Sequence, residues 1–314
     1  KSLYTIRQPN RIIFGMNSTR EFSFEKNSLI ITSSGAKSRG WLDYLNIKDY
    51  EIFDSVEPNP SMETVEKILS EYDQSFSSVI GLGGGSSLDV AKFVANKLKI
   101  KKILIPTTFG SGSEVTRISV LQIDGKKTSF HSDDLLADIS IIDPYFIKDA
   151  PFEIIKNSAI DACAQCTEAF DSRLANIYTK FLCEKAFDIL EKALIDKTYE
   201  NLAYGAMISG LGFGNSSTTL GHALSYVYSN EGISHGHALS FTTLIAHKFN
   251  NSKFYDRFKI LVDNLNFKPI KLKQNLQNAS KLIQTDRKHL DNNPKNVSDD
   301  DIVTLLKLIN FKNI

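Results

Sequence analysis

The sequence predicts an α/β domain built on a parallel β-sheet, followed by an all-helical domain. In the first half, short β-branched runs alternate with amphipathic stretches, as in successive β-α-β units. Some runs, such as VIGL and ILI, are continuously apolar, which is typical of strands covered on both faces. After Asp149 apolar residues recur every three or four positions instead. We therefore expect an α/β domain over residues 1–149 and a helical domain over residues 150–314.

The order of the expected elements follows from these patterns. Strands are expected in SLIITSS, YEIFDSV, SSVIGLGG, KKILIPTT and DISIIDP, with helices in SMETVEKILSEY and SLDVAKFVANKLK between them. In the second half, helices are expected in PFEIIKNSAIDACAQCTEAF, IYTKFLCEKAFDILEKAL, NLAYGAMISGLGFG, FKILVDNL and DIVTLLKLINF. The segments NFKPIKLKQN and DRKHLDNNPKNVSDD are expected to be loops.

Composition narrows the class of protein. The chain has 314 residues, 42% of them hydrophobic, which is enough for a packed core. A net charge of +1 argues against nucleic acid as a partner. Apolar runs are shorter than the roughly 20 residues that span a bilayer, and KSLYTIRQPN lacks the pattern of a secretory signal. We expect a cytoplasmic protein without membrane partners, in which Cys163 and Cys166 are small buried thiols within a helix.

The first motif that could carry chemistry follows a predicted strand and opens a helix. It reads GGGSSLDVAK and begins at Gly83. Consecutive glycines let the backbone approach a ligand, and a helix N-terminus offers free N–H groups to an anion such as a pyrophosphate. Asp89 could cap the helix or bind a hydroxyl, and Lys92 adds a cation. The alternative is a tight strand-to-helix turn without a ligand.

The second motif, PTTFGSGSEVT, starts at Pro106 after the next predicted strand. Its hydroxyl groups belong to the carboxyl end of the same sheet, where ligands bind in open parallel sheets. A surface loop rich in Ser and Thr is the alternative. Together, the two motifs favour a nucleotide site.

The third group lies in the helical half. Asp161 and Gln165 are four residues apart and share one helix face. Far downstream come His222, His235 and His237, flanked by small residues. A carboxylate and imidazoles from separate helices could bind a divalent metal. Ordinary structural histidines are the alternative, and the remaining three histidines of the chain receive no role.

Taken together, the motifs resemble those of the iron-containing alcohol dehydrogenase family. The resemblance is carried, in order, by QPNRIIFG, EPNPSMETV, GGGSSLDVAK, IPTTFGSGSEVT, IIDP, DACAQCTEAF, LGHALSY and ISHGHAL. The last motif, with KTSF, is most similar to the branch of phosphonoacetaldehyde reductases, or hydroxyethylphosphonate dehydrogenases. The resemblance implies a dehydroquinate synthase-like fold, with the active site in a cleft between a nucleotide-binding domain and a helical domain.

The resemblance also implies a set of site residues. The cofactor pyrophosphate would be held by Gly83, Gly84, Gly85 and Ser86, and the rest of the cofactor site lined by Asp89, Thr107, Thr108 and Ser113. The metal, Fe²⁺ or Zn²⁺, would be held by Asp161, Gln165, His222 and His235.

Two positions depart from the family pattern. Gln165 stands where the family carries a histidine, and an amide oxygen is a weaker donor than an imidazole. Tyr226 replaces a further histidine that usually follows the third ligand by four positions. A protein that binds a metal through Asp161, His222 and His235 and a protein without a metal are both consistent with these changes.

The choice between NADP and NAD can be argued from the first strand. Members that prefer NAD carry an Asp after this strand, where this chain has Ser33 or Ser34. No carboxylate would repel a 2′-phosphate there, and Lys37 and Arg39 are near in sequence. The sequence therefore favours NADP.

The expected function is hydride transfer between NAD(P)H and a small aldehyde or primary alcohol, in a protein expected to form a homodimer. His237 is a candidate proton relay, with a structural role as the alternative, and without a metal Tyr226 or His237 would have to stabilise the alkoxide. Two alternatives remain: a dehydroquinate-synthase-like cyclase, and a metal-free nucleotide-binding protein without dehydrogenase activity.

Overall fold

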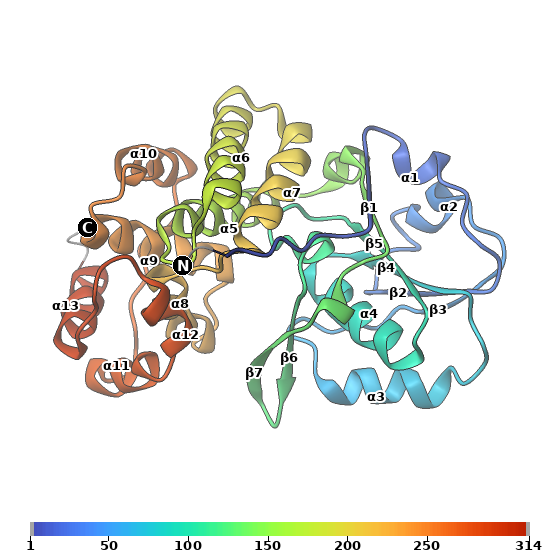
Figure 1. Ribbon diagram of the computed structural model, residues 1–314, viewed down its shortest axis with the longest axis horizontal. Helices are drawn as coiled ribbons and strands as arrows, with labels where there is room; N and C mark the ends of the chain where they lie inside the picture. Colours follow the sequence, from blue (N-terminus) through green and yellow to red (C-terminus); the bar gives the residue numbers. More distant parts are fainter. Residues whose placement is uncertain (1–2, 312–314) are drawn as a thin grey trace. The chain divides into compact units, whose positions relative to one another are not determined.

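The computed structural model describes residues 3–311, which form two compact units (Figure 1). One unit runs from Thr5 to Ala150, and the other starts at Pro151 and includes Leu3 and Tyr4. The chain thus passes from one unit to the other next to Asp149, where the sequence pattern changes. Within the described residues, no helix is both long and apolar enough to cross a membrane.

The N-terminal unit is built on a six-stranded sheet in which every neighbouring pair runs parallel, in the order β1-β8-β5-β4-β2-β3. The central strands β2 and β4 are buried along their whole length because both faces of the sheet are covered. The predicted α/β fold with a parallel sheet is therefore confirmed. The strands are β1 (Arg11–Phe14), β2 (Ser28–Thr32), β3 (Tyr50–Phe53), β4 (Ser78–Gly83), β5 (Lys101–Pro106) and β8 (Ile139–Ile142).

The helices of this unit cover the sheet and connect its strands. Most residues of the helix α4 are buried, and its apolar residues join those of β2, β4 and β5 in one core cluster. It begins directly after β4, so its N-terminus lies at the carboxyl edge of the sheet. The helical segments are α1 (Ser18–Glu21), α2 (Trp41–Leu45), α3 (Met62–Glu71) and α4 (Gly85–Leu98), with the 3₁₀ turns η1 (Ser113–Val115), η2 (Asp133–Leu135) and η3 (Pro144–Asp149).

Two strand features of this unit were not expected from the sequence. The motif that contains RIIF forms the edge strand β1, which pairs with β8. An antiparallel hairpin, β6 (Ile118–Ile123) and β7 (Lys126–His131), leaves the main sheet. Its turn residues Asp124 and Gly125 both have positive φ, at 51° and 76°. An Asp-Gly pair is the typical signal for such a two-residue turn, so the hairpin could have been predicted.

Within the described residues, the second unit contains helices and no strands, as predicted. Its helices are α5 (Phe152–Asp171), α6 (Ile177–Asp196), α7 (Leu202–Phe213), α8 (Leu220–Asn230), α9 (His235–Asn250), α10 (Tyr255–Leu265), α11 (Leu276–Gln284), α12 (Arg287–Asn292) and α13 (Asp299–Asn310), with the 3₁₀ turn η4 (Tyr199–Asn201). The expectation that DRKHLDNNPKNVSDD is a loop was wrong for residues 287–292, which form α12, and for residues 299–300, which begin α13; residues 293–298 are a loop as expected. Asp286 caps α12 by accepting a hydrogen bond from the backbone N–H of His289, and this local bond allows the short helix to form.

Glycines allow the helices of this unit to pack closely. A Cβ atom added to Gly205 of α7 would lie 2.7 Å from the Leu190 side chain of α6, and one added to Gly212 would lie 2.5 Å from Sγ of Cys183. The apolar faces of α8 and α9 share a core cluster with those of α11 and α13. The helix α5 packs against α6, α7 and α9. This packing places α5, α8 and α9 next to one another.

Candidate functional site

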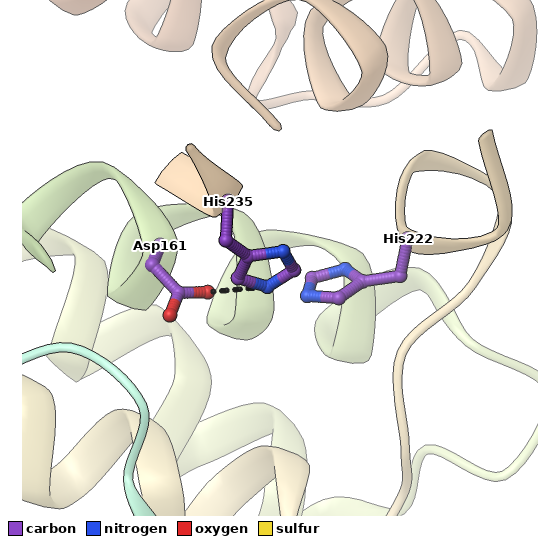
Figure 2. Close-up of side chains that lie close together, drawn as sticks. All are labelled: Asp161, His222 and His235. Carbon is purple, nitrogen blue, oxygen red and sulfur yellow. Dashed lines mark ion pairs between the residues drawn. The ribbon is translucent and has the colours of Figure 1, made fainter. Parts of the chain in front are cut away.

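Three side chains from three helices converge in the helical unit (Figure 2). Asp161 lies in the middle of α5, His222 in the first turn of α8, and His235 is the first residue of α9. One carboxylate oxygen and one nitrogen of each imidazole lie within 4.8 Å of one another. Oδ1 of Asp161 is buried and accepts no hydrogen bond within the described part of the chain. One carboxylate and two imidazoles form a donor set that suits Fe²⁺ or Zn²⁺, so these residues fit a divalent metal.

His235 reaches the cluster because the start of α9 packs tightly against α5. A Cβ atom added to Gly236 would collide with the backbone carbonyl of Asn157. The hydroxyl of Ser234 donates a hydrogen bond of 2.8 Å to Oδ1 of Asn157. These contacts bring Nε2 of His235 to 3.4 Å from Oδ1 of Asp161. The glycine of the ISHGHAL motif is thus required for the approach of the two helices.

His222 is held by the buried carboxylate of Glu168, which is not among the site residues predicted from the sequence. Nδ1 of His222 lies 2.9 Å from Oε2 of Glu168, and both side chains are buried. Burial alone would raise the pKa of Glu168, but the charge and hydrogen bond of His222 outweigh it and lower the pKa to about 2. Because an ionised carboxylate only accepts hydrogen bonds, Nδ1 carries the proton. Nε2 of His222 then has a free lone pair for a metal.

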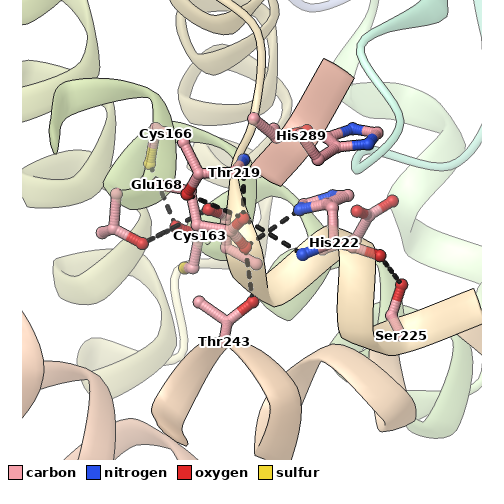
Figure 3. Close-up of polar contacts among 12 residues, drawn as sticks. Cys163, Cys166, Glu168, Thr219, His222, Ser225, Thr243 and His289 are labelled. Carbon is pink, nitrogen blue, oxygen red and sulfur yellow. Dashed lines mark hydrogen bonds and ion pairs between the residues drawn. The ribbon is translucent and has the colours of Figure 1, made fainter. Parts of the chain in front are cut away.

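Glu168 is itself fixed by several donors (Figure 3). Its Oε1 accepts hydrogen bonds from the backbone N–H groups of Thr219 and His222, at 3.0 and 3.1 Å. Its Oε2 accepts a bond of 2.6 Å from the hydroxyl of Thr243. A Cβ atom added to Gly221 would lie 2.5 Å from Oε2, so the glycine of LGHALSY makes room for this carboxylate. Glu168 therefore sets the orientation of His222.

The predicted ligand Gln165 lies on α5 between Asp161 and Glu168. The spacing of four and then three residues places all three on one helix face. Gln165 is buried, with 6% of its surface exposed. The same spacing could have identified Glu168 from the sequence, since it extends the face on which Asp161 and Gln165 were recognised.

A further imidazole, that of His289, lies beside the cluster (Figure 3). Its ring is nearly parallel to that of His222, with an interplanar angle of 16° and 6.1 Å between the centroids. Nδ1 of His289 is 2.9 and 2.8 Å from the two carboxylate oxygens of Asp286. The sequence predicts no role for His289, because His289 lies 54 positions after His235, in a polar segment typical of a loop.

The two residues predicted to act on protons lie in different surroundings. The ring of Tyr226, on α8, is 6.0 Å from that of His289, and burial raises the pKa of its hydroxyl well above the ordinary value. Nε2 of His237 lies 2.6 Å from the backbone carbonyl of Lys268, to which it donates a hydrogen bond. This bond ties α9 to the segment that follows α10. Tyr226 thus lies next to His289 as a protonated hydroxyl, whereas His237 is engaged by the backbone.

The glycine-rich motif forms the turn between β4 and α4 in the N-terminal unit. Gly83 has a φ of +151°, a conformation that favours glycine, and Gly84 is the N-cap of α4. Because Gly83 pairs with Pro106 in the sheet, the two predicted loops lie side by side. A Cβ atom on Gly84 would lie 3.0 Å from the hydroxyl oxygen of Thr108, and one on Gly85 would lie 2.9 Å from that of Ser111. No side chain caps the start of α4, and backbone N–H groups in the first turn of a helix, such as that of Ser86, are of the kind that bind anions.

Asp89 and Ser113, both predicted to line the cofactor site, bond to each other. The hydroxyl of Ser113 donates to Oδ1 of Asp89 at 2.6 Å, and the backbone N–H of Val120 donates to Oδ2 at 3.1 Å. Lys92 is fully buried, and its ammonium group donates to the carbonyl of Ile118 at 2.6 Å. These bonds join α4 to the hairpin and to the loop after β5. Lys92 thus links α4 to the start of the hairpin and does not offer a cation at the surface of the turn.

Two more predicted cofactor residues, Ser33 and Thr107, directly follow strands. Ser33 comes after β2, and Thr107 comes after β5, where its backbone N–H donates to the carbonyl of Gly83 at 2.9 Å. Lys37 is exposed near Ser33, and the guanidinium of Arg39 lies over the ring of Trp41, 5.1 Å from its centroid. The carboxyl ends of β2, β4 and β5 therefore gather the predicted nucleotide residues at one edge of the sheet.

The three cysteines are buried and free. Burial raises the pKa of Cys166 to about 12, and it raises the pKa of Cys163 as well. A thiol with so high a pKa is a poor nucleophile, so the interpretation of these residues as packing groups agrees with their surroundings.

Comparison with known proteins gives a consistent result. The family model for iron-containing alcohol dehydrogenases matches residues 9–144, and the model for the C-terminal part of the Fe-containing alcohol dehydrogenase family matches residues 155–286. The 4-hydroxybutyrate dehydrogenase of Clostridium kluyveri is 32% identical over 64% of this chain and 64% of that enzyme, which is less than two thirds of its length.

Solved structures show the same fold. A crystal structure of an iron-containing alcohol dehydrogenase, 25% identical, has a TM-score of 0.89 and covers 98% of this chain and 99% of that chain. The sulfoacetaldehyde reductase of Bifidobacterium kashiwanohense, solved in complex with NAD⁺, is 22% identical with a TM-score of 0.88, and covers 98% of this chain and 99% of that chain. Since the two family models together match most of the chain, this protein belongs to the iron-containing alcohol dehydrogenase family.

Proposed function

We propose that this protein is a metal-dependent oxidoreductase that transfers a hydride between NAD(P)H and a small aldehyde or primary alcohol. The observation that carries the proposal is the convergence of Asp161, His222 and His235, with His222 oriented by the buried Glu168. Membership of the family and the dehydrogenase names of the relatives support the same reaction class.

The helical unit would hold the metal. Asp161, His222 and His235 are the proposed ligands, with Gln165 as the fourth predicted position on the same face of α5. A bound Fe²⁺ or Zn²⁺ supplies a Lewis acid that polarises the carbonyl oxygen of the aldehyde. Glu168 keeps the proton of His222 on Nδ1, and Tyr226, whose pKa is raised by burial, keeps its hydroxyl proton and can donate a hydrogen bond. His237 serves as a positioning residue through its bond to Lys268.

The N-terminal unit would hold the nucleotide. The turn of Gly83, Gly84 and Gly85 with Ser86 offers backbone N–H groups to the pyrophosphate. Thr107 and Thr108 would line the same edge, while Asp89 and Ser113 support it through their mutual bond. The absence of a carboxylate at Ser33, together with the nearby Lys37, favours NADP; the NAD⁺ complex of the Bifidobacterium enzyme keeps NAD as the second candidate.

Two alternatives predict different behaviour. A dehydroquinate-synthase-like cyclase would use the nucleotide without net turnover, and a metal-free nucleotide-binding protein would bind it without turnover or metal. The fit of three ligand atoms within 4.8 Å favours a metal protein, and the names of the relatives favour net oxidation and reduction. We further propose a cytoplasmic homodimer that acts without nucleic acid or membrane partners, to be tested by light scattering of the purified protein.

The decisive experiment measures bound metal and NAD(P)H oxidation in the same preparation. Chelation is expected to abolish oxidation with a panel of small aldehydes, and added Fe²⁺ or Zn²⁺ to restore it. The variant Asp161→Asn should lose both metal and activity. Asp171→Asn, which removes a carboxylate from the end of the same helix, is the matched control and should keep both. A protein that binds no metal and oxidises neither cofactor with any aldehyde would contradict the proposal.

A further inference from the structure

The pair formed by Asp286 and His289 lies beside the proposed metal site but has none of the roles given above. Asp286 is the N-cap of α12, and His289 lies one turn later in the same helix. Both carboxylate oxygens of Asp286 contact Nδ1 of His289, at 2.9 and 2.8 Å. The centroid of the His289 ring is 6.1 Å from that of His222 and 6.0 Å from that of Tyr226. A small carboxylate–imidazole pair is thus anchored next to the residues that would bind the metal.

The contact with Asp286 determines what the other ring nitrogen can do. Burial would raise the pKa of Asp286, but the hydrogen bond and charge of His289 outweigh it, so the pKa is lowered and the carboxylate is ionised. An ionised carboxylate accepts hydrogen bonds, so Nδ1 of His289 carries a proton. In the neutral imidazole Nε2 is then an acceptor. Within residues 3–311 no hydrogen bond to this Nε2 is found, and 15% of the side chain is exposed.

The charges around this acceptor favour a neutral partner over an anion. Asp161, Glu168 and Asp286 contribute three carboxylates to this part of the helical unit. The positive groups that act on Glu168 and Asp286 are histidines, and neither carboxylate forms an ion pair with a lysine or arginine within the described chain. A bound divalent cation would offset two of these three negative charges, so an anionic substituent would still meet a net negative charge, whereas a hydroxyl group can donate a hydrogen bond without this cost.

We propose that Nε2 of His289 accepts a hydrogen bond from a hydroxyl group on the carbon next to the reacting carbon of the substrate. The site then selects short hydroxyaldehydes and diols over plain aldehydes and alcohols of the same length. His289 is a specificity-determining residue that touches the substrate, and Asp286 is a positioning residue that sets its tautomer. The inference rests on the proposed oxidoreductase function and narrows its substrate class.

The test compares two substrates that differ by one hydroxyl group, glycolaldehyde and acetaldehyde, on the metal-loaded protein. In the wild type, kcat/KM should be higher for glycolaldehyde. His289→Leu should lower kcat/KM for glycolaldehyde about tenfold, mainly through a higher KM, and so remove most of this preference. The kcat/KM for acetaldehyde, which lacks the hydroxyl group, should change little. His289→Gln, whose amide oxygen can accept a hydrogen bond near the position of Nε2, should restore part of the preference. An equal loss for both aldehydes would overturn the inference.

Asp286→Asn provides a second variant that keeps the helix cap, because Asn is as good an N-cap as Asp. The amide of Asn can donate to Nδ1, which moves the ring proton to Nε2 and converts the acceptor into a donor. The preference for glycolaldehyde should fall, and oxidation of NAD(P)H with the anionic sulfoacetaldehyde should rise. A wild-type preference for sulfoacetaldehyde over glycolaldehyde would favour an anionic substrate and overturn the inference.

A binding measurement separates failure of this inference from failure of the proposed function. If the wild type turns over neither these two aldehydes nor any other of the panel, the proposed function fails, and saturation-transfer NMR of the Zn²⁺-loaded protein with ethylene glycol and ethanol still tests His289. A signal for ethylene glycol that exceeds that for ethanol, and that His289→Leu removes, supports the contact. Equal signals in wild type and variant overturn it.

Discussion

Oε2 of Glu168 lies 2.9 Å from Nδ1 of His222, and this contact joins the helix that carries Asp161 to the helix that carries the third predicted metal ligand. A carboxylate behind a ligating imidazole fixes the ring and its tautomer, so that the outward nitrogen meets the metal with its lone pair. Glu168 also accepts hydrogen bonds from the backbone N–H of His222 and from Thr219 and Thr243, which lie before α8 and within α9. One buried carboxylate therefore links the three helices that supply Asp161, His222 and His235.

Glu168→Gln is expected to weaken metal binding by about 10- to 100-fold, because the amide fixes neither the proton on Nδ1 nor the ring as firmly. The affinity for Zn²⁺ would be measured by competition with a chromogenic chelator. Thr243→Val removes one donor to Glu168 and leaves the contact with His222, so it should produce a smaller loss. Unchanged affinity in the Glu168 variant would show that the contact serves folding alone.

Gln165→His is expected to tighten metal binding by at least about tenfold, equivalent to about 1.4 kcal/mol, because an imidazole is a stronger donor to Fe²⁺ and Zn²⁺ than an amide oxygen. The residue lies one helical turn from Asp161 and is buried with it. The same chelator competition measures the change. Affinity equal to that of the wild type would show that the side chain at position 165 does not reach the metal.

The sequence predicted the parts of this molecule that depend on local patterns. The alternation of apolar runs with amphipathic stretches predicted β2, β4, β5 and β8, because a buried strand requires apolar residues. The glycine motif predicted the turn at Gly83, because a positive φ favours glycine. The sequence grouped Asp161 and Gln165 with His222, His235 and His237, and the structure brings Asp161, His222 and His235 of this group together.

The helix spacing could place Glu168 on the face of Asp161, but the partners of the remaining site residues depend on tertiary packing, which the local sequence does not show. Glu168 meets His222 across 54 positions of sequence, and which residue stands behind a histidine is decided by how α5 and α8 pack. His289 lies in the six-residue helix α12, and the polar sequence around this helix predicted a loop. Asp89 was expected to line the cofactor site by its place in the motif, and only the fold of the hairpin shows that it bonds to Ser113 and Val120.

Gly84→Ala is expected to lower the affinity for NADPH by about tenfold, or about 1.4 kcal/mol, with little change in folding. Its φ of −78° suits any residue, but the added Cβ atom would lie 3.0 Å from the hydroxyl oxygen of Thr108, between the two loops that we assign to the nucleotide. Binding would be measured by the change in NADPH fluorescence. Gly214→Ala, at the end of α7 with a φ of −60°, is the matched control in the other unit and should bind NADPH normally. Equal binding by both variants would remove the turn from the nucleotide site.

His247 should make the helical unit less stable as the pH falls below about 6.5. Its ring is fully enclosed, and Nε2 donates a hydrogen bond of 2.8 Å to the hydroxyl of Thr167, which in turn donates to the carbonyl of Cys163. Burial lowers the pKa of His247 to about 4, against an ordinary value of 6.5.

The sign of this effect follows from which state binds the proton first. Above about pH 6.5 His247 is neutral in both the folded and unfolded chains and contributes no pH dependence. Between about pH 6.5 and 4 the unfolded chain takes up the proton and the folded chain does not, so the free energy of unfolding falls by about 3 kcal/mol in total. Below about pH 4 both states are protonated and the loss from this group ends.

Urea unfolding followed by far-ultraviolet circular dichroism reports mainly on the helical unit and measures this slope. His247→Gln, which has no titrating ring, should be less stable than the wild type at neutral pH and should lack this part of the pH dependence. His131→Gln, on the exposed strand β7 of the other unit, is the control and should keep it. A His247→Gln variant with the full wild-type slope between about pH 6.5 and 4 would show that other groups cause the acid sensitivity.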